Sequence, residues 1–246
     1  MTNETKICQN CHNEFTIEPE DFQFYEKIKV PPPTFCPECR FQRRITFRNE
    51  RKLFKNVNAR TGEKILTIYP PESGLIVYTD EDFRSDLWDP MDSGADYDFQ
   101  KPFFEQFLEL FKKVSRPARN YLVDTMVNSD YSANCGRLKN CYLLFNTDHN
   151  EDCAYGNGVN WSKNCYDISH CNSSERCYES FWINKCNRAH FCSQCVECLE
   201  IWFCKDCLGC SNCFGCMNLR NKKYCIFNKQ YTKEEYQEKI NDMKLN

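Results

Sequence analysis

The stretch CKDCLGCSNCFGC, which runs from Cys204 to Cys216, places a cysteine at every third position. It belongs to a longer pattern: sixteen of the 20 cysteines lie between Cys135 and Cys225, and every gap between neighbours is a multiple of three. Units such as NCYLLF, NCYDIS and RCYESF repeat a polar residue, a cysteine and an aromatic residue. A six-residue unit cannot bury a core alone, but coils of such units stack equivalent side chains into a continuous interior. The spacing therefore predicts a β-solenoid.

The spacing of three also predicts how the chain turns. Residues three apart in a straight strand point to opposite faces, so the chain must turn a corner between successive inward cysteines. Asn, Asp, Gly and Ser, which tolerate tight or left-handed corners, stand beside many of these cysteines. The Asn residues directly before a cysteine are expected to form amide ladders along the stack; they are Asn134, Asn140, Asn164 and Asn212. The gaps fit a coil of either 12 or 18 residues.

The length of the chain bears on the state of the cysteines. A chain of 246 residues can bury a core, so the cysteines are not needed to rescue a small fold. No stretch approaches the roughly 18 uninterrupted apolar residues that cross a bilayer, and the first ten residues carry no apolar run. We therefore expect a cytoplasmic protein, in whose compartment thiols stay reduced. Buried thiols or metal ligands are then favoured over disulfides.

Metal storage and an iron-sulfur electron carrier are alternative interpretations of the Cys-x2-Cys runs. Ferredoxin-type ligation ends in Cys-Pro, whereas CKDCLGCSNC lacks this proline and has its fourth cysteine one position early. The period of three also continues to Thr147, Val159 and Ile183, which suit a packed interior but not a ligand set. Structural thiols are favoured, while free thiols, disulfides and metal ligands all stay open for the 16 repeat cysteines.

Two further Cys-x2-Cys pairs near the N-terminus predict a metal site of another kind. CQNC contains Cys8 and Cys11, and CPEC contains Cys36 and Cys39. Each pair forms a tight turn that directs two thiolates at one ion, and two such turns complete the tetrahedral four-sulfur shell of structural Zn²⁺. We expect one structural zinc ion. A helix is predicted to begin at the second pair, because RFQRRITFRNERKLFK contains no Gly or Pro.

The same N-terminal segment carries a particular order of residues around its cysteines. C-x2-C is followed by a Phe, a Phe-Tyr pair, prolines and C-P-x-C-R-x-x-R; the residues are Phe15, Phe24, Tyr25, Pro32, Pro33, Cys36, Pro37, Cys39, Arg40 and Arg43. This order resembles a zinc-ribbon family, which implies a treble-clef fold over about the first fifth of the chain. His12 departs from the family pattern, which usually has Gly there.

Two later segments carry a second resemblance. SDLWDPMDSGADYDFQKPFFEQFLELFKKV and NCFGCMNLRNKKYCIFNKQYTKEEY are similar to a group of full-length, uncharacterised cysteine-rich proteins from uncultivated bacteria. Some of that group are labelled class III CoA-transferases. The chain has no evident nucleophilic carboxylate site in a large α/β fold, so its residues do not support that label.

The middle and the end of the chain predict further elements. Between Ile65 and Thr79, the β-rich runs ILTIY and LIVYT flank the turn signal PPESG, which indicates a hairpin. Pro102 opens PFFEQFLELFKKV, whose apolar residues recur at helical spacing. We expect this helix to bury its aromatic stripe, either against the zinc module or over the following domain. Thr232 and Glu235 fit the capping box of a final helix that covers the solenoid end.

Together these patterns predict a mainly β protein with four segments. Residues 1–56 form a treble-clef zinc ribbon, and residues 57–128 form a small α+β linker domain. Residues 129–228 form the cysteine-laddered β-solenoid, and residues 229–246 form its capping helix.

The sequence favours a binding protein over an enzyme. The four histidines have no evident Ser or Asp constellation, and there is no P-loop, dinucleotide-binding glycine pattern or GxSxG. A solenoid offers a long, regular surface of the kind that usually binds protein. We therefore expect a non-enzymatic zinc-binding interaction scaffold with a protein partner. Nothing in the sequence indicates a membrane or a small-molecule substrate.

Nucleic-acid or ribosome binding is the alternative function. The net charge of −3 provides no overall attraction to phosphate, but basic residues gather after the second cysteine pair; they are Arg40, Arg43, Arg44, Arg48, Arg51 and Lys52. Phe41 and Phe47 lie among them, and phosphate contacts beside aromatic rings suit nucleic acid. Eleven Asp/Glu follow between Glu72 and Glu109, against two basic residues, and this acidic segment could complement the basic one within the fold.

Overall fold

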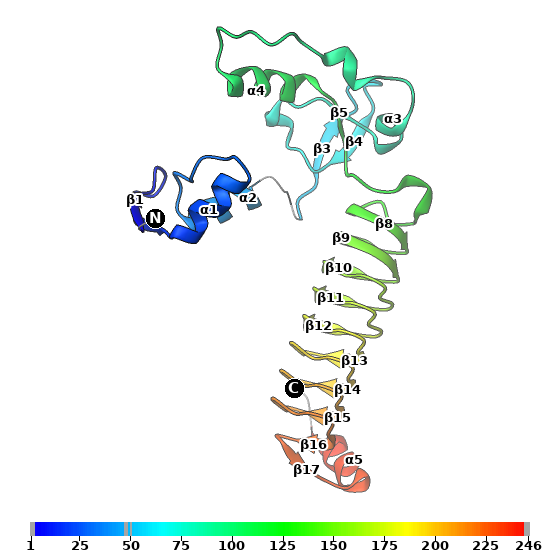
Figure 1. Cartoon of the computed structure of the whole chain (residues 1–246). Coiled ribbons are helices and arrows are strands. Elements are labelled where there is room, and N and C mark those ends of the chain that lie inside the picture. The colour runs from blue at the N-terminus through cyan, green and yellow to red at the C-terminus, as the bar shows by residue number, and fades with distance from the viewer. Residues whose placement is uncertain (1–2, 47–48, 50, 244–246) are drawn as a thin grey trace. The chain divides into compact units, whose positions relative to one another are not determined.

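The computed structural model describes residues 3–46, 49 and 51–243 of the chain (Figure 1). Its contacts divide the chain into two units, Met1–Asn49 and Glu50–Asn246. The first unit contains the four N-terminal cysteines, and the second contains the other sixteen. Strands are the commonest elements in the described residues, so the predicted mainly β class is confirmed.

The first unit is built around its cysteines. Strands β1 (Glu4–Ile7) and β2 (Glu14–Ile17) form an antiparallel hairpin, and helices α1 (Pro19–Lys27) and α2 (Pro37–Ile45) follow. Phe15 and Ile17 alternate with exposed residues along β2 and pack against three of the cysteines. The buried core therefore consists of two apolar side chains and three cysteines, with partly buried rings packed around them.

Helix α2 is the helix predicted at the second cysteine pair. Cys36 is its N-cap residue, Pro37 occupies its first position, and Cys39 is its one buried residue. The helix ends at Ile45, earlier than the Gly- and Pro-free segment would permit, and β3 (Phe54–Val57) begins nine residues later. The second half of that segment therefore does not extend the helix as far as Phe54.

The predicted hairpin between Ile65 and Thr79 is wrong. β4 (Lys64–Thr67) pairs antiparallel with β3, and β5 (Val77–Tyr78) pairs in parallel with β6 (Arg116–Pro117). The PPESG signal forms a 3-10 turn, η1 (Pro71–Ser73), which ends at the left-handed Gly74. The true hairpin turn lies earlier, where Gly62 has φ 77°. A positive φ of this kind suits Gly, which has no Cβ.

The acidic segment folds into short helices, α3 (Asp80–Arg84) and η2 (Pro90–Ser93), before α4 (Phe103–Lys113). Asp80 is buried and accepts the backbone N–H groups of Arg119 and Tyr121, each at 3.0 Å, so it joins α3 to the segment that leads into the solenoid. No residue of α4 is buried, so the expectation that its aromatic stripe packs over the following domain is wrong, while packing against the zinc module stays a prediction. Local periodicity predicted the helix but not its neighbours.

The predicted solenoid is an 11-stranded sheet in the second unit (Figure 1). Strands pair in parallel with a register of twelve residues, as in Tyr142↔Ala154 and Ala154↔Tyr166, so one coil contains twelve residues. In order, the strands are β7 (Met126–Val127), β8 (Ala133–Lys139), β9 (Tyr142–Glu151), β10 (Ala154–Asn157), β11 (Tyr166–Ser169), β12 (Tyr178–Phe181), β13 (Asn187–His190), β14 (Leu199–Trp202), β15 (Ser211–Phe214), β16 (Lys223–Ile226) and β17 (Lys229–Gln230).

Each coil has four sides of three residues. From Ser129 to Cys216 every third residue is buried, and from Asn134 to Gly215 the residue before each inward residue has φ between 47° and 66°. The corners are therefore left-handed, including corners made by large residues such as Trp161. A left-handed non-Gly residue costs about 1–2 kcal/mol. Hydrogen bonds to the next coil offset this cost; the N–H of Tyr142, for example, donates to the Cys153 carbonyl at 3.0 Å.

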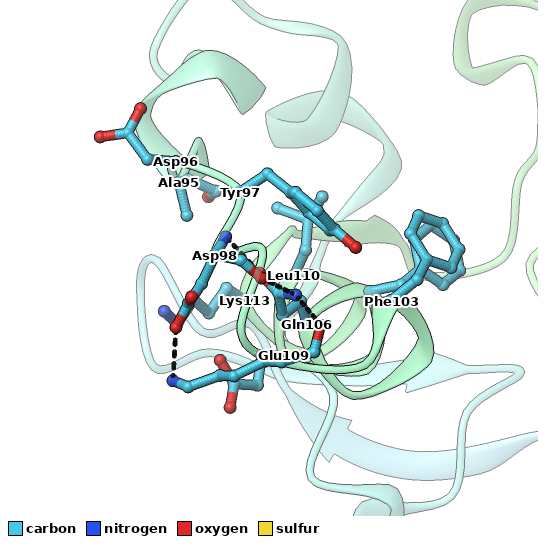
Figure 2. A pocket seen from close by; sticks show the side chains of 12 residues that line it. Ala95, Asp96, Tyr97, Asp98, Phe103, Gln106, Glu109, Leu110 and Lys113 are labelled. Carbon is cyan, nitrogen blue, oxygen red and sulfur yellow. Dashed lines mark hydrogen bonds and ion pairs between the residues drawn. The ribbon is translucent and has the colours of Figure 1, made fainter.

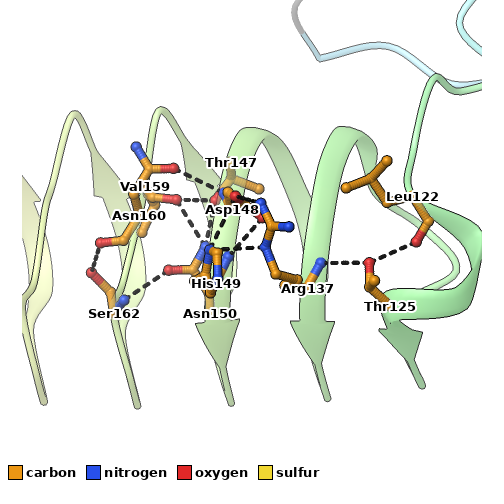
Figure 3. Close-up of polar contacts among 10 residues, drawn as sticks. All are labelled: Leu122, Thr125, Arg137, Thr147, Asp148, His149, Asn150, Val159, Asn160 and Ser162. Carbon is orange, nitrogen blue, oxygen red and sulfur yellow. Dashed lines mark hydrogen bonds and ion pairs between the residues drawn. The ribbon is translucent and has the colours of Figure 1, made fainter.

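In the first coils, polar side chains that face the interior form hydrogen bonds with buried backbone groups (Figure 3). The Thr147 hydroxyl donates to the Val159 carbonyl, and the Asn150 amide donates to the same carbonyl at 2.8 Å. The Asn150 oxygen accepts the N–H of Ser162 at 2.9 Å. Outside, the ladder predicted at Asn140 is present, with a carboxylate as its last member: Asn128 donates to Asn140 at 3.2 Å, and Asn140 donates to Asp152 at 3.0 Å. Asn134 likewise accepts from Asn120 at 2.8 Å, whereas within the described residues the side chains of Asn164 and Asn212 form no such bond.

Both ends of the solenoid are covered. Leu122, just before the short helix η3 (Val123–Thr125), lies over Gly136 at the first coils. At the other end β17 turns back antiparallel on β16, and α5 (Lys233–Asp242) follows with both hydrogen bonds of the predicted capping box. Tyr236 of α5 is buried and lies 5.8 Å from the ring of Tyr224. The predicted capping helix is confirmed.

Candidate metal centre

Two turns bring the four N-terminal cysteines together. Cys8 follows β1, Cys11 closes the next turn, and Cys36 and Cys39 begin α2. Their four sulfurs all lie within 4.8 Å of one another. Across the described ranges 3–46, 49 and 51–243, this is the one group of three or more Cys, His, Asp or Glu that meets that distance. Cys8, Cys36 and Cys39 are buried, whereas Cys11 is exposed.

The first turn places His12 in a left-handed conformation. His12 has φ 60°, a region that Gly adopts most readily, and its N–H donates to the Cys8 carbonyl at 3.0 Å. The N–H of Cys8 donates to the Asn13 carbonyl at 2.9 Å. His12 therefore takes the backbone conformation of a glycine and leaves the turn intact.

Hydrogen bonds to sulfur prepare the site for a cation. The N–H of Cys36 donates to the Cys8 sulfur at 3.2 Å, and the Asn10 amide donates to the Cys39 sulfur at 3.3 Å. Burial raises the pKa of Cys8, but backbone N–H groups of Cys11, Cys36 and Asn10 outweigh it and bring that pKa down to about 6. Donors that stabilise a thiolate favour a metal ligand.

Cys39 shows the opposite shift. The Asn10 amide lowers the pKa of Cys39, but burial and three neighbouring sulfurs outweigh it and raise that pKa to about 12. Four sulfurs this close cannot all ionise without a cation, because their charges repel. All four thiols can therefore ionise together only if a cation lies between them.

The spacing of the sulfurs fits a tetrahedral ion. Metal–sulfur bonds of about 2.3 Å in a tetrahedron place two sulfurs about 3.8 Å apart. The sulfurs of Cys11 and Cys36 are 3.7 Å apart. The four cysteines therefore form a site that could hold one thiolate-ligated metal ion.

The basic residues predicted for nucleic-acid contact are divided between the two units. Arg40, Arg43 and Arg44 lie on α2, while Arg51 and Lys52 belong to the second unit. Arg48, like Phe47, lies outside the described residues. The guanidinium of Arg43 lies 5.5 Å from the Phe35 ring centre, and that of Arg44 lies 6.0 Å from Phe41. The geometry therefore gathers three of the six residues on one exposed helix.

The solenoid thiols point at backbone carbonyls. The Cys165 thiol donates to the Lys163 carbonyl at 3.2 Å, and the Cys207 thiol donates to the Lys205 carbonyl at 3.4 Å. The Ser174 hydroxyl makes the equivalent bond to Asn172 at 3.1 Å. Cysteine and serine therefore play the same part at inward positions: each is small, and each carries a donor that meets the carbonyl two residues earlier.

Burial keeps isolated solenoid thiols protonated. Desolvation raises the pKa of Cys135 to about 12 and that of Cys171 to about 11. Buried cysteines in apolar surroundings are unreactive, because the thiolate is the nucleophile and the metal ligand. Cys135 and Cys171 therefore differ from Cys8, whose pKa is lowered. Where solenoid thiols lie next to one another, hydrogen bonds between them lower the pKa of one, such as Cys165, and raise that of its neighbour, such as Cys153.

One side of the solenoid carries an aromatic ring in every coil. We call it the aromatic side; its rings are Tyr131, Tyr142, Tyr155, Tyr166, Tyr178, Phe191, Phe203, Phe214 and Phe227. Ring contacts join neighbouring coils from Tyr131 through Tyr166 and again from Tyr178 through Phe227, with ring centres 5.4 Å apart at Tyr131–Tyr142 and 6.4 Å apart at Phe214–Phe227. Their exposed fractions run from 38% at Tyr178 to 71% at Phe227, apart from the half-buried Phe214.

Sequence reasoning noted aromatic residues after cysteines but missed their alignment. Each ring lies one or two residues after an inward position of one column, and that column is visible only once the coil length of twelve is known. The side of the coil that comes just before the aromatic side carries charged residues instead. There Glu151 forms ion pairs with Lys139 at 3.0 Å and with Lys163 at 2.8 Å. Two adjoining sides therefore differ sharply in chemistry.

Comparison with known proteins adds no identification. No protein-family model matches the chain, and no curated protein is significantly similar to it. Of the helices in residues 3–46, 49 and 51–243, none is both long and apolar enough to span a membrane.

Proposed function

We propose that the chain is a non-enzymatic interaction scaffold with a structural zinc ion and a solenoid surface that binds protein. The observation that carries the proposal is the aromatic side, with one ring per coil along the whole solenoid. Tyr and Phe are enriched where proteins bind one another, because they supply large contact areas at low entropy cost. An exposed, continuous row of them favours recognition over mere surface packing.

Zinc is the metal that best suits the N-terminal cluster. Four cysteine thiolates in a tetrahedron are a common structural zinc set, and a closed shell leaves no position for a substrate. The start of α2 at the second cysteine pair supports the treble-clef assignment. The role proposed for this zinc is to hold the first unit together, since its apolar core amounts to Phe15, Ile17 and a few partly buried rings.

The shape of the aromatic side favours a slender partner. Nine coils about 4.8 Å apart extend roughly 40 Å, and one side is about 10 Å wide, so the strip offers roughly 400 Å². A stable globular interface needs about 800 Å² per partner. An extended peptide segment that lies along the coils suits this strip better than a second globular surface.

Matched variants test the scaffold. We would replace Tyr142, Tyr166 and Tyr178 together by serine, and compare this protein with one that carries serine at Lys139 and Lys163. All five side chains are exposed, so both proteins should fold. Cross-linking in cells followed by mass spectrometry should reveal a partner that the tyrosine variant loses and the lysine variant keeps. Identical partner sets for the two variants would remove the proposal.

Nucleic-acid or ribosome binding through α2 is the second candidate. In the described part of the chain, neither Arg43 nor Arg44 forms an ion pair, and Phe41 beside them is 55% exposed. Unpaired arginines beside an exposed ring are suited to phosphate contact with base stacking. This reading requires RNA or DNA binding that falls steeply with salt and is lost on Arg43→Ala with Arg44→Ala. No binding at low salt would exclude it.

Metal storage is less well supported for the solenoid. Its thiols already donate to carbonyls, and serine takes the same role at Ser162, Ser174 and Ser180. Elemental analysis distinguishes metal storage from the scaffold proposal. Zinc at one ion per chain supports the scaffold, whereas several metal ions per chain would support storage.

A further inference from the structure

Two carboxylates interrupt the corners of the aromatic side in its middle coils. The corner residues of this side recur at a spacing of twelve; they are Tyr131, Leu143, Tyr155, Asp167, Glu179, Phe191, Phe203, Gly215 and Phe227. Asp167 and Glu179 are the only charged residues among them, and both are exposed. They directly follow Tyr166 and Tyr178, which pair in register. The two carboxylates therefore lie on consecutive coils, about 4.8 Å apart along the solenoid.

Asp167 and Glu179 have no ion-pair partner among residues 3–46, 49 and 51–243. Basic residues on the other sides of the nearby coils pair with other acids; the pairs are Lys163–Glu151, Arg176–Glu175, Lys185–Glu197 and Arg188–Glu200. Arg51 donates to the Ser169 hydroxyl at 3.4 Å, on the adjoining side. Like charges on neighbouring strands destabilise a sheet. A cation from outside would therefore stabilise this pair of carboxylates.

The row of ring contacts breaks at the same two coils. In the described part of the chain, rings contact one another from Tyr131 through Tyr166 and again from Tyr178 through Phe227, but no ring contact joins Tyr166 to Tyr178. These two rings are 47% and 38% exposed. His190, one coil beyond Tyr178, adds no positive charge near pH 7, because burial lowers its pKa. Exposed aromatic rings beside unpaired carboxylates attract an organic cation.

The pocket beside α4 lacks such a bias of charge (Figure 2). Asp96, Asp98 and Glu109 line it, but Lys101 and Lys113 line it as well. The Lys101 ammonium lies 3.9 Å from the Asp98 carboxylate. The mixed charges of this pocket select no partner, whereas the two carboxylates of the aromatic side select a cation.

We propose that the pairs Tyr166–Asp167 and Tyr178–Glu179 bind an arginine side chain of an extended partner segment. We call these four residues the arginine site. A guanidinium is planar and lies flat on an aromatic ring, and its fork of N–H donors meets carboxylates in directed hydrogen bonds. A lysine ammonium is a point charge and provides neither. The inference rests on the proposed function, because the rings on both sides of the arginine site would hold the remainder of the segment.

The test uses the full chain and three fluorescent 12-residue peptides of Gly, Ser, Leu and Pro that differ in one central residue. That residue is arginine, lysine or citrulline, which has nearly the shape of arginine but no charge. Binding is measured by fluorescence anisotropy up to millimolar protein. The arginine peptide should bind about tenfold or more tightly than either of the other two, the scale of a single interface anchor.

Charge-matched variants locate the effect. Asp167→Asn with Glu179→Gln should weaken binding of the arginine peptide to the level of the citrulline peptide, whose own binding should not change. Glu197→Gln with Asp206→Asn removes the same charge at exposed, left-handed corners of other sides and should keep the preference for arginine. The first variant should also have a Tm no lower than the second, because its substitutions remove the repulsion between neighbouring carboxylates.

The outcomes separate the arginine site from the scaffold. Equal binding of the arginine and citrulline peptides, lost for both when Tyr142, Tyr166 and Tyr178 are replaced by serine, would overturn the arginine site and leave the scaffold standing. Binding of no peptide would also overturn the site, and the cross-linking test would then decide the scaffold alone. Equal binding of the lysine peptide would overturn the choice of a guanidinium. An equal effect of the two charge-matched variants would mean that general charge, and not this site, attracts arginine.

Discussion

Replacing Cys171 by valine tests whether the solenoid cysteines are packed thiols or metal ligands. Cys171 is fully buried, and the residues one coil away in its column are Val159 and Ile183. Its thiol donates to the Ser169 carbonyl at 3.3 Å, but that carbonyl also accepts the N–H of Trp182 at 2.9 Å. Valine therefore leaves the Ser169 carbonyl with a partner and continues an aliphatic column.

The expected cost of Cys171→Val is small. Swaps of similar volume between buried apolar side chains change stability by less than about 1.5 kcal/mol. For a domain of this size, 1 kcal/mol shifts Tm by about 2–4 °C, so the shift should stay below about 6 °C. Far-UV circular dichroism measures it, and elemental analysis of the same sample should give an unchanged metal content. Thiol titration in denaturant should find one group fewer than the wild-type 20.

Two results would refute this reasoning. One is a fall in bound metal in Cys171→Val, since packed thiols hold none. The other is a Tm of Cys171→Val more than about 10 °C below that of the wild type while Cys171→Ser keeps the wild-type Tm. That result would mean that the site requires a polar atom. In the native wild-type protein, the sixteen solenoid thiols should not titrate, because all are buried.

Three further predictions concern other parts of the chain. Cys39→Ser should remove the bound metal of the first unit, measured by elemental analysis, because it breaks the four-sulfur set. Gly156→Ala should destabilise the solenoid by about 1–3 kcal/mol in urea unfolding, because the new Cβ would lie 2.9 Å from Val159 and 3.1 Å from the Ile168 carbonyl. Hydrogen bonding to Arg60 lowers the pKa of Asp82, so its stabilisation is present above the unfolded pKa of about 3.9 and is lost as pH falls through the folded value. The stability difference between wild type and Asp82→Asn should therefore shrink between pH 5 and about pH 3.

Each of these predictions has an opposite outcome. Full metal content in Cys39→Ser would show that three cysteines suffice. Wild-type stability of Gly156→Ala would mean that the interior is looser than the contacts indicate. A pH-independent difference for Asp82→Asn would show that the ion pair with Arg60 does not persist in solution.

The solenoid was predictable because its signal is strictly periodic. A cysteine spacing of three recurs through the whole segment, and no local choice of conformation alters that count. The coil length was not predictable, since the gaps fit both 12 and 18 residues. It depends on left-handed corners at residues such as Trp161 and Leu143, which local preference disfavours and which only the stacked coils make acceptable.

The pairing of short strands in the linker was not predictable from local pattern. The two runs after Ile65 look like a hairpin, but β4 pairs with the preceding β3 and β5 pairs with β6, almost forty residues later. Partner choice depends on what the rest of the chain offers, and local propensity does not contain that information. The same limit applies to α4, whose periodicity predicted a helix but not its exposure.

The ligands of the candidate metal site were predictable from the sequence. The hydrogen bonds and the backbone conformation around those ligands were not. Cys-x2-Cys spacing predicted the four cysteines that the structure brings within 4.8 Å. The donor from Asn10 and the left-handed φ of His12 depend on how the two turns meet, which spacing does not describe. The aromatic side was hidden for a related reason, because residues twelve apart look unrelated until the register is known.

The reversal of direction at β17 gives the solenoid a defined length. Every parallel coil presents the same row of backbone donors and acceptors to the next, so nothing in the repeat itself says where to stop. β17 runs antiparallel to β16, and α5 follows it beside the same strand, so the last row is shielded from other chains. The turn after Ile226 thus removes the open parallel edge onto which a further coil, or another chain, would otherwise add.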